Sequence, residues 1–359
     1  MIELKVELGT RSYPIWIGAG LLDQPGALDS FLGSADVMVV TNDVVGPLYL
    51  DRLTVALGDR RIDSVVLPDG EAHKDLGAMQ SILDRLVDQR YGRDAVLVTL
   101  GGGVVGDIGG FAAAVYQRGI AFVQVPTTLL AQVDSSVGGK TGVNHPGGKN
   151  LIGAFHQPLA VMADTKTLDT LCDRELSAGL AEVAKYGLIG DADFFAWLEQ
   201  NAERLVARDS EALQHAIRVS CEAKAAIVAE DEFERGRRAL LNLGHTYGHA
   251  IERCVGYGEW LHGEAVAAGM CMAAEFSAKI GRSVREDVDR TKALLARLKL
   301  PVAPPSIAVG DFLAAMSIDK KVVAGEIRLV LMNGIGDAFV TADYPRDEME
   351  ALLARQLGA

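Results

Sequence analysis

The segment that decides the fold reads Ala95-Val-Leu-Val-Thr-Leu-Gly-Gly-Gly-Val-Val-Gly-Asp107, and a helix-like run at 108–116 follows it. A short apolar run rich in valine and leucine predicts a buried strand. The glycines directly after it predict a tight turn into a helix, whose N-terminus offers free N–H groups and a positive dipole to a phosphate. The segment therefore predicts a strand, a glycine turn and a helix of an α/β fold.

The glycine spacing in this turn matches the G-x-G-x-x-G pattern of dinucleotide-binding proteins, but two features differ from the usual arrangement. The turn does not lie in the first strand–helix–strand unit. The strand that follows closes as Gln124-Val-Pro-Thr-Thr128, with no acid at its end. Glycine-rich turns also occur for packing reasons, so the spacing by itself leaves nucleotide binding and packing as alternatives.

The strand of this segment is one of four strand-like runs in the first half of the chain. They lie at 36–41, 62–67, 95–100 and 121–126, with helix-length segments between them. Strands that alternate with helices predict βαβ units and a mostly parallel, Rossmann-like sheet.

The pattern changes at about Asp173. The segments 174–188, 211–230 and 262–280 have helical periodicity, and β-like runs at 326–332 and 338–340 are too few for another sheet domain. We therefore predict an α/β nucleotide-binding domain at 1–170 and a mainly α-helical domain at 171–359. The hinge is expected near 165–175, and the active site in the interdomain cleft.

The composition is that of an acidic globular protein, with 359 residues, 49% hydrophobic content and a formal net charge of −13. A chain of this length is expected to form about two domains. The charge argues against a general nucleic-acid binder, because a phosphate backbone requires a basic face. The first residues contain no apolar signal core, and no apolar stretch approaches membrane-spanning length.

The four cysteines form no C-x-x-C motif; they are Cys172, Cys221, Cys254 and Cys271. They indicate neither a disulfide framework nor a thiolate zinc cluster, so a reducing compartment fits best. Together with the absence of a signal core, this predicts a cytoplasmic protein without membrane contact.

Polar residues follow the predicted strands at their carboxyl ends, where open α/β sheets bind ligands. The run Asp69-Gly-Glu-Ala-His-Lys74 follows the second of these strands, and Thr127 and Thr128 follow the last. Glu71 could accept ribose hydroxyls and Lys74 could bind phosphate, although an exposed Glu/Lys pair is also common in surface turns. Their convergence on one sheet edge favours dinucleotide binding.

Three histidines fall within eighteen positions of the second half, as His245, His249 and His262. His245 and His249 are four residues apart on one helix face, so spacing alone would make both metal ligands. Glu182, on an otherwise apolar helical stretch, is a candidate carboxylate ligand. The alternatives are a salt bridge of Glu182 with Lys185 and hydrogen-bonded core histidines. Two histidines with a glutamate form a catalytic zinc pattern, which makes zinc the first choice.

The glycine-rich stretch at 134–153 carries Lys140 and Lys149. It is not a Walker loop, because that motif would need glycine where Asp134 stands. Further polar candidates that could face the same cleft are Arg118, Lys224, Arg238 and Asn242. Each could be a solvated surface residue, but a local cluster of cations in an acidic protein favours a specific anionic ligand.

In combination these motifs resemble the 3-dehydroquinate synthase family, nearly end to end. The matching segments lie at 69–74, 101–107, 126–128, 134–140, 147–150, 176–185, 238–249 and 261–264. The resemblance implies metal ligands at Glu182, His245 and His262. It assigns His249 to the substrate and to proton transfer, in place of the metal role that spacing alone favours.

The resemblance also implies a set of substrate and catalytic residues. They are Asp134, Lys140, Lys149, Asn150, Lys185, Lys224, Arg238 and Asn242, while Arg118 would reach a phosphate across a homodimer interface. The implied NAD contacts are Asn42, Asp69, Glu71, Lys74, Gly102, Gly103, Val104, Asp107, Thr127, Thr128, Lys140, Lys149, Thr167 and Thr170. Some family members place an acid at position 42, so Asn42 and its neighbour Asp43 are alternatives as the ribose ligand.

The family's substrate is a seven-carbon phosphorylated keto acid, 3-deoxy-D-arabino-heptulosonate 7-phosphate (DAHP), whose carboxylate and phosphate would account for the cations. The implied reaction is transient oxidation by NAD, phosphate elimination, re-reduction, ring opening and intramolecular aldol addition to 3-dehydroquinate, within the shikimate pathway. Zinc is the preferred metal, with cobalt as the alternative.

Three other functions are compatible with parts of the pattern. A metal- and NAD-dependent polyol or alcohol dehydrogenase would need both cofactor sites but not so many pocket cations. A related sugar phosphate cyclase would differ only in pocket residues. A non-catalytic nucleotide or metal sensor would not require His249 and Lys185 together with the metal ligands.

Overall fold

The computed structural model describes residues 1–256, 258–317, 322–323 and 326–358. By their contacts these residues form two compact units. Unit 1 comprises Met1–Leu171 and Leu213–Phe233, and unit 2 comprises Cys172–Ala212 and Glu234–Ala359. The chain thus leaves unit 1 after Leu171 and returns to it for one helix.

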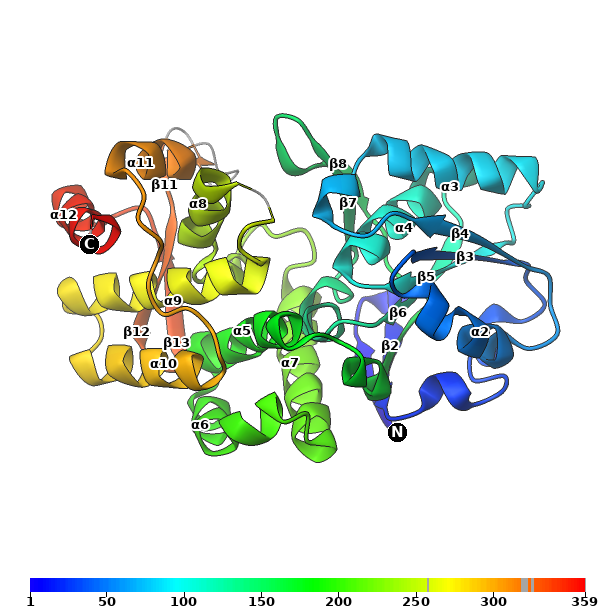
Figure 1. Cartoon of the computed structure of the whole chain (residues 1–359), viewed down its shortest axis with the longest axis horizontal. Coiled ribbons are helices and arrows are strands. Elements are labelled where there is room, and N and C mark those ends of the chain that lie inside the picture. Colours follow the sequence, from blue (N-terminus) through cyan, green and yellow to red (C-terminus); the bar gives the residue numbers. More distant parts are fainter. Residues whose placement is uncertain (257, 318–321, 324–325, 359) are drawn as a thin grey trace. The chain divides into compact units, whose positions relative to one another are not determined.

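Unit 1 is built on a seven-stranded sheet with the order β1-β2-β9-β6-β5-β3-β4 (Figure 1). Its strands are β1 (Ile2–Val6), β2 (Tyr13–Gly18), β3 (Val37–Asn42), β4 (Ile62–Leu67), β5 (Val96–Gly101), β6 (Ala121–Pro126) and β9 (Ala160–Asp164). Every neighbouring pair is parallel except β1 and β2. The predicted mostly parallel, Rossmann-like sheet is confirmed.

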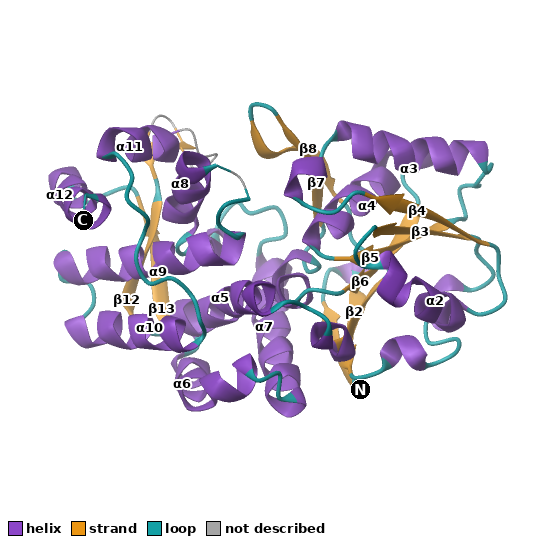
Figure 2. Ribbon diagram, in the orientation of Figure 1, coloured by secondary structure: helices purple, strands orange, loops and turns teal. Residues whose placement is uncertain are grey.

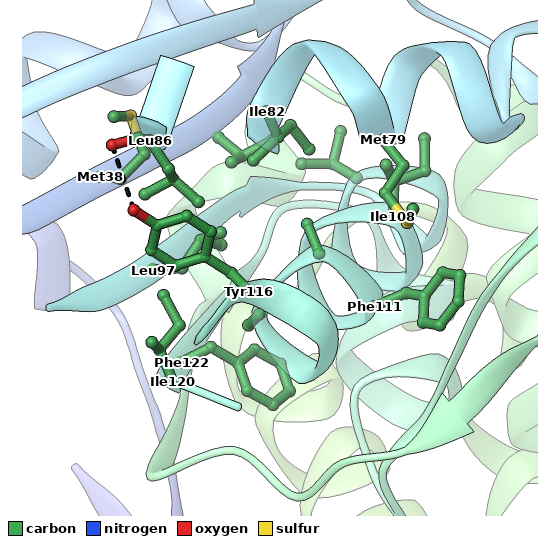
Figure 3. Packing of buried hydrophobic residues seen from close by; sticks show 14 of the residues in the cluster. Met38, Met79, Ile82, Leu86, Leu97, Ile108, Phe111, Tyr116, Ile120 and Phe122 are labelled. Carbon is green, nitrogen blue, oxygen red and sulfur yellow. Dashed lines mark hydrogen bonds between the residues drawn. The ribbon is translucent and has the colours of Figure 1, made fainter. Parts of the chain in front are cut away.

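Helices cover both faces of the sheet, which explains why β3 and β5 are buried along their whole length. Alternate residues of each strand pack toward α2 (Gly46–Leu57) on one face and toward α3 (Leu76–Asp88) and α4 (Gly103–Val115) on the other. Figure 3 shows the hydrophobic cluster on the face covered by α3 and α4, in which Ile82 and Leu86 of α3 lie near Met38 and Leu97 of the sheet. Burial of each such side chain stabilises the fold by about 1.5–3 kcal/mol.

The neighbouring strands β3 and β5 lead into helices on opposite faces of the sheet. The chain continues from β3 into α2 and from β5 into α4. Such a switch point opens a crevice at the carboxyl ends of the two strands, where α/β sheets bind ligands. The glycine turn at 101–103 lies at this edge.

Two further elements complete unit 1. An antiparallel hairpin joins β7 (Lys140–His145) to β8 (Gly148–Phe155). The helix α7 (Ser210–Glu230) packs onto unit 1, where Cys221 lies 3.2 Å from the backbone oxygen of Gln132. Helical periodicity predicted α7 and placed it in the domain 171–359, whereas its contacts group Leu213–Phe233 with unit 1.

Unit 2 is mainly helical, as predicted (Figure 2). Its helices are α5 (Asp173–Gly190), α6 (Ala192–Val206), α8 (His245–Val255), α9 (His262–Lys279), α10 (Arg285–Arg297), α11 (Val309–Ser317) and α12 (Arg346–Leu357). Two small hairpins accompany them, β10 (Val322–Val323) with β11 (Glu326–Ile327), and β12 (Leu329–Gly334) with β13 (Asp337–Thr341). The central helix α9 contacts α5, α8, α10 and β12. Among the described residues, no helix is long and apolar enough to cross a membrane.

Candidate active site

Three helices of unit 2 bring a carboxylate and two imidazoles together. Glu182 lies in the middle of α5, while His245 and His262 are the first residues of α8 and α9. The Nε2 atom of His245 is 3.5 Å from Oε1 of Glu182, and that of His262 is 3.7 Å from the same oxygen. One potential ligand atom from each residue lies within 4.8 Å of the others, which is a geometry for one metal ion.

Glu182 is fully buried, and within the described part of the chain neither carboxylate oxygen accepts a hydrogen bond. The Lys185 ammonium forms an ion pair with Oε2. Burial of a carboxylate is costly unless its charge is compensated and its lone pairs are used. Oε1, which has no hydrogen-bond partner among the described residues and faces two imidazoles, fits a divalent cation. The salt bridge and the histidine cluster, treated as alternatives in the sequence, occur together.

Glycines allow these helices to approach closely. A Cβ on Gly263, in the first turn of α9, would overlap the carbonyl of Ala178 in α5. A Cβ on Gly269 would overlap the carbonyl of Gly244, which directly precedes α8. The close backbone contacts fix the spacing of the three candidate ligands.

His249 lies one turn after His245 on α8, with ring centroids 5.6 Å from His245 and 5.8 Å from His262. The ligand group that contains Glu182 does not include it. Together with Glu252 and His262, His249 forms a second group of potential ligand atoms. Sequence reasoning missed Glu252, although its place three residues after His249 on a helix was a usable signal.

The start of α4 has the features of an anion-binding helix terminus. Gly102 is its N-cap and provides no side-chain hydrogen bond to the first turn, which begins with Gly103 and Val104. The hydroxyl of Thr127 is buried and has no hydrogen-bond partner among the described residues, and a Cβ on Gly102 would lie 3.1 Å from Thr128. These free donors at a helix N-terminus fit a pyrophosphate.

A buried lysine connects candidate cofactor and substrate residues. The Lys74 ammonium lies 2.6 Å from Oδ2 of Asp107 and 2.7 Å from Oδ1 of Asn150. Burial alone would lower the pKa of Lys74, but attraction by Asp107 and Glu71 more than offsets this and raises it. Asn144, which sequence reasoning missed, donates to Glu71 at 2.8 Å and accepts from the backbone N–H of Asn150 at 2.9 Å.

The end of β3 is tied to the loop after β4. The Asn42 amide donates to Oδ1 of Asp69 at 2.5 Å, and the Asp69 backbone N–H donates to Asp43 at 3.0 Å. The structure therefore brings both ribose-ligand alternatives, Asn42 and Asp43, to the same loop. Asn42 is 5% exposed, which favours a role in holding this loop.

The two threonines after β9 are held by side chains from other elements. Thr167 accepts from Gln132 at 3.1 Å, and the Thr170 hydroxyl lies 2.6 Å from that of Tyr49. Gln132 also donates to two backbone oxygens, so it anchors the segment that follows β6 to that following β9.

Two of the candidate substrate residues are paired within unit 1. The Lys224 ammonium of α7 donates to the Asp134 carboxylate at 2.7 Å and to its backbone oxygen at 2.6 Å. Because α7 packs on unit 1, residues ninety positions apart in the sequence become neighbours. Lys140, at the start of β7, is exposed, whereas Lys149 in β8 is half-buried.

The remaining candidates occupy separate elements. Arg238 lies in a short 3-10 helix (Arg237–Asn242) of unit 2 and is 1% exposed. Asn242, at the end of this helix, donates to Glu234 at 2.9 Å. Arg118 of unit 1 is exposed, has a left-handed backbone (φ 67°), and makes no ion pair or side-chain hydrogen bond with the described residues.

Comparison with known proteins identifies the family. Models described as the N-terminal and C-terminal regions of 3-dehydroquinate synthase match residues 64–178 and 179–322. Over 354 residues the chain is 57% identical to 3-dehydroquinate synthase of Pseudomonas fluorescens, covering 98% of this chain and 97% of the relative. The chain belongs to the 3-dehydroquinate synthase family. The predicted family and its enzymatic, lyase activity are thereby confirmed.

One further relative supports this membership, and one solved structure shows the same fold. The 3-dehydroquinate synthase of Methylococcus capsulatus is 60% identical over 339 residues, covering 94% of each chain. The solved structure of 2-epi-5-epi-valiolone synthase from Streptomyces hygroscopicus, with NAD+ and Zn2+ bound, has a TM-score of 0.90 and 29% identity, covering 100% of this chain and 99% of that one. The chain is thus far more similar to 3-dehydroquinate synthases than to this related cyclase.

Proposed function

We propose that the chain converts DAHP to 3-dehydroquinate and inorganic phosphate, using NAD catalytically and one divalent metal ion. Zinc is the first choice for the metal and cobalt the second. The identity of 57–60% to 3-dehydroquinate synthases supports the reaction. The NAD+ and Zn2+ in the structure of 2-epi-5-epi-valiolone synthase support the cofactors.

The observation that carries the proposal is the buried carboxylate of Glu182, whose Oε1 lacks a hydrogen bond among the described residues and faces His245 and His262. These three residues would hold the metal ion. When bound, such an ion supplies Lewis-acid stabilisation to the oxygen of the hydroxyl that is oxidised. Lys185, in an ion pair with Glu182, would keep that carboxylate oriented.

The residues at the carboxyl edge of the sheet would bind NAD, which accepts a hydride and later returns it. The N–H groups of Gly102, Gly103 and Val104 suit the pyrophosphate, as does the hydroxyl of Thr127. The other proposed NAD residues are Asn42, Asp69, Glu71, Lys74, Asp107, Thr128, Lys140, Lys149, Thr167 and Thr170. We assign NAD binding to 1–170 and metal and substrate binding mainly to 171–359.

The cationic and amide residues would bind the carboxylate and phosphate of the substrate. This group comprises Lys140, Lys149, Asn150, Lys185, Lys224, Arg238 and Asn242, and the further proposed substrate residue, Asp134, is paired with Lys224. Burial of Arg238 and of the Lys224 ammonium strengthens their attraction for an anion, because water screens it less. His249, adjacent to the candidate metal ligands, would move a proton to or from the substrate.

Arg118 would act in a neighbouring subunit of a homodimer. Its exposure, its left-handed backbone and its lack of an ion pair with described residues support this role, since a strained conformation is retained where function needs it. All four cysteines are free, which supports a cytoplasmic, reducing compartment.

A single assay tests the proposed function. Purified protein is mixed with DAHP and a catalytic amount of NAD, and phosphate and NADH are followed together. We expect stoichiometric phosphate release, no lasting NADH absorbance and loss of activity with a chelator. Steady NADH accumulation without phosphate release would contradict the proposal and indicate a polyol dehydrogenase.

A further inference from the structure

The two candidate histidine ligands have the same arrangement of ring nitrogens. Each points Nε2 toward Glu182, at 3.5 Å from His245 and 3.7 Å from His262. The Nδ1 atom of His245 lies 3.1 Å from the carbonyl oxygen of Leu243. A carbonyl can only accept, so Nδ1 of His245 carries a proton, and in the neutral ring Nε2 then holds the lone pair that a metal needs.

The corresponding acceptor for His262 is a side chain. Its Nδ1 atom lies 3.3 Å from Oε2 of Glu252, which is 3% exposed. An ionised carboxylate can only accept, so this contact places a proton on Nδ1, and in the neutral ring the lone pair is then on Nε2. Glu252 lies seven residues after His245, on the same face of α8. One helix therefore supplies a candidate ligand and the acceptor that orients another.

The ring of His262 needs such an acceptor more than that of His245. The His262 side chain is 34% exposed, compared with 11% for His245. A half-exposed ring at the first position of a helix has fewer packing contacts to hold its orientation. The buried carboxylate of Glu252, which lies next to Nδ1, compensates for this.

We propose that Glu252 is a positioning residue, which fixes the tautomer and ring orientation of His262 and thereby strengthens metal binding. The inference rests on the proposed metal site. Acceptors behind metal-bound histidines orient the ring and raise its basicity, and their loss typically weakens metal binding by about 10–100-fold.

The test compares Glu252→Ala and Glu252→Gln with the wild type, using the full chain stripped of metal. Zinc affinity is measured by competition with a chromophoric chelator. Nitrogen-15 NMR of the histidine rings, at a pH where they are neutral, reports the tautomer of His262 without any metal. The matched control is Glu275→Gln, which changes a carboxylate on α9 that is also largely buried and is bound to Lys292 and Arg285.

We expect zinc binding to weaken about 10–100-fold in Glu252→Ala. The glutamine oxygen can still accept from Nδ1, so Glu252→Gln should lose less. Glu275→Gln should bind zinc as the wild type does. The proton of His262 should lie on Nδ1 in the wild type and should move partly to Nε2 in Glu252→Ala.

The inference is overturned if Glu252→Ala keeps wild-type zinc affinity, or if Glu275→Gln weakens binding equally. It is also overturned if both Glu252 variants and His249→Ala abolish zinc binding, because Glu252 would then be a ligand in the group with His249 and His262. If Glu252→Ala does not fold, as judged by circular dichroism, Glu252→Gln and the wild-type tautomer decide the question. A wild-type protein that binds no zinc would instead refute the proposed metal site.

Discussion

Gly263 of α9 packs against the carbonyl of Ala178 in α5 so closely that no Cβ could lie between them. Gly263 directly follows His262, and Ala178 lies about one turn before Glu182. The separation of the two candidate metal ligands therefore depends on a glycine that is not itself a candidate ligand.

Replacement of this glycine should separate the two helices. We expect Gly263→Ala to lower the free energy of unfolding of unit 2 by about 2 kcal/mol or more and to weaken zinc binding. Thermal melting and zinc content after dialysis measure the two effects. Gly190→Ala, at the open end of α5, is the control and should be neutral or slightly stabilising. Equal behaviour of the two variants would refute the packing argument.

Replacement of His249 and replacement of His262 should differ in their effect on zinc binding. We expect His262→Ala to lose zinc on dialysis, because two ligands hold zinc poorly. His249→Ala should retain zinc but lose turnover by about 100-fold or more, as expected for a proton-transfer residue. Metal analysis of both dialysed variants checks the assignment, which is wrong if the two behave the other way round.

Subunit exchange tests the role of Arg118. We expect Arg118→Ala and His249→Ala homodimers to be inactive alone. If Arg118 serves the neighbouring site, mixed dimers contain one intact site, and random exchange should restore about a quarter of wild-type activity. No recovery in dimers shown to have exchanged would place Arg118 in the site of its own chain.

The glycine at the start of α4 should determine NAD binding. A Cβ on Gly103 would lie 2.8 Å from the Ser135 hydroxyl, so Gly103→Val would crowd the helix terminus. We expect NAD affinity to fall about tenfold or more while zinc affinity stays unchanged, because the metal residues lie in unit 2. Titration with NAD, followed by protein fluorescence, measures this. Unchanged NAD affinity would exclude this helix terminus as the pyrophosphate site.

An ion-pair cluster at α9 and α10 should make stability depend on pH. Burial alone would raise the pKa of Glu275, but bonds and attraction from Lys292 and Arg285 more than offset this and lower it. Because the folded-state pKa is below the unfolded value, the stabilisation is present above about pH 4.5 and is lost as pH falls through the folded value. We expect Glu275→Gln to lower the free energy of unfolding by about 1 kcal/mol at pH 7. The difference from wild type should shrink on acidification, and a difference that grows below pH 4 would contradict this.

Local sequence patterns predicted most elements of the sheet correctly. The run at 62–67 coincides with β4, and that at 95–100 differs from β5 by one residue at each end. Both are parallel strands with short apolar runs; β5 is buried along its whole length, whereas β4, at the edge of the sheet, is mostly half-buried. The strands β1, β2 and β9 of the same sheet were not predicted; β1 alternates apolar with charged residues, and β9 (Ala160–Asp164) is only five residues long. The glycine turn proved shorter than expected, since α4 begins at Gly103.

The sequence by itself determined the class of fold, the family and the list of candidate residues, because these depend on periodicity and on motifs that are local in the chain. Only the tertiary structure decided which candidates are neighbours. It brought Lys224 to Asp134 and Lys74 to Asn150, and it placed Glu182 close to His245 and His262 in space. Such contacts depend on the packing of helices and strands far apart in sequence, which no local spacing encodes. Glu252 illustrates the difference, since its position on α8 was readable from the sequence, whereas its contact with His262 arises only where α8 meets α9.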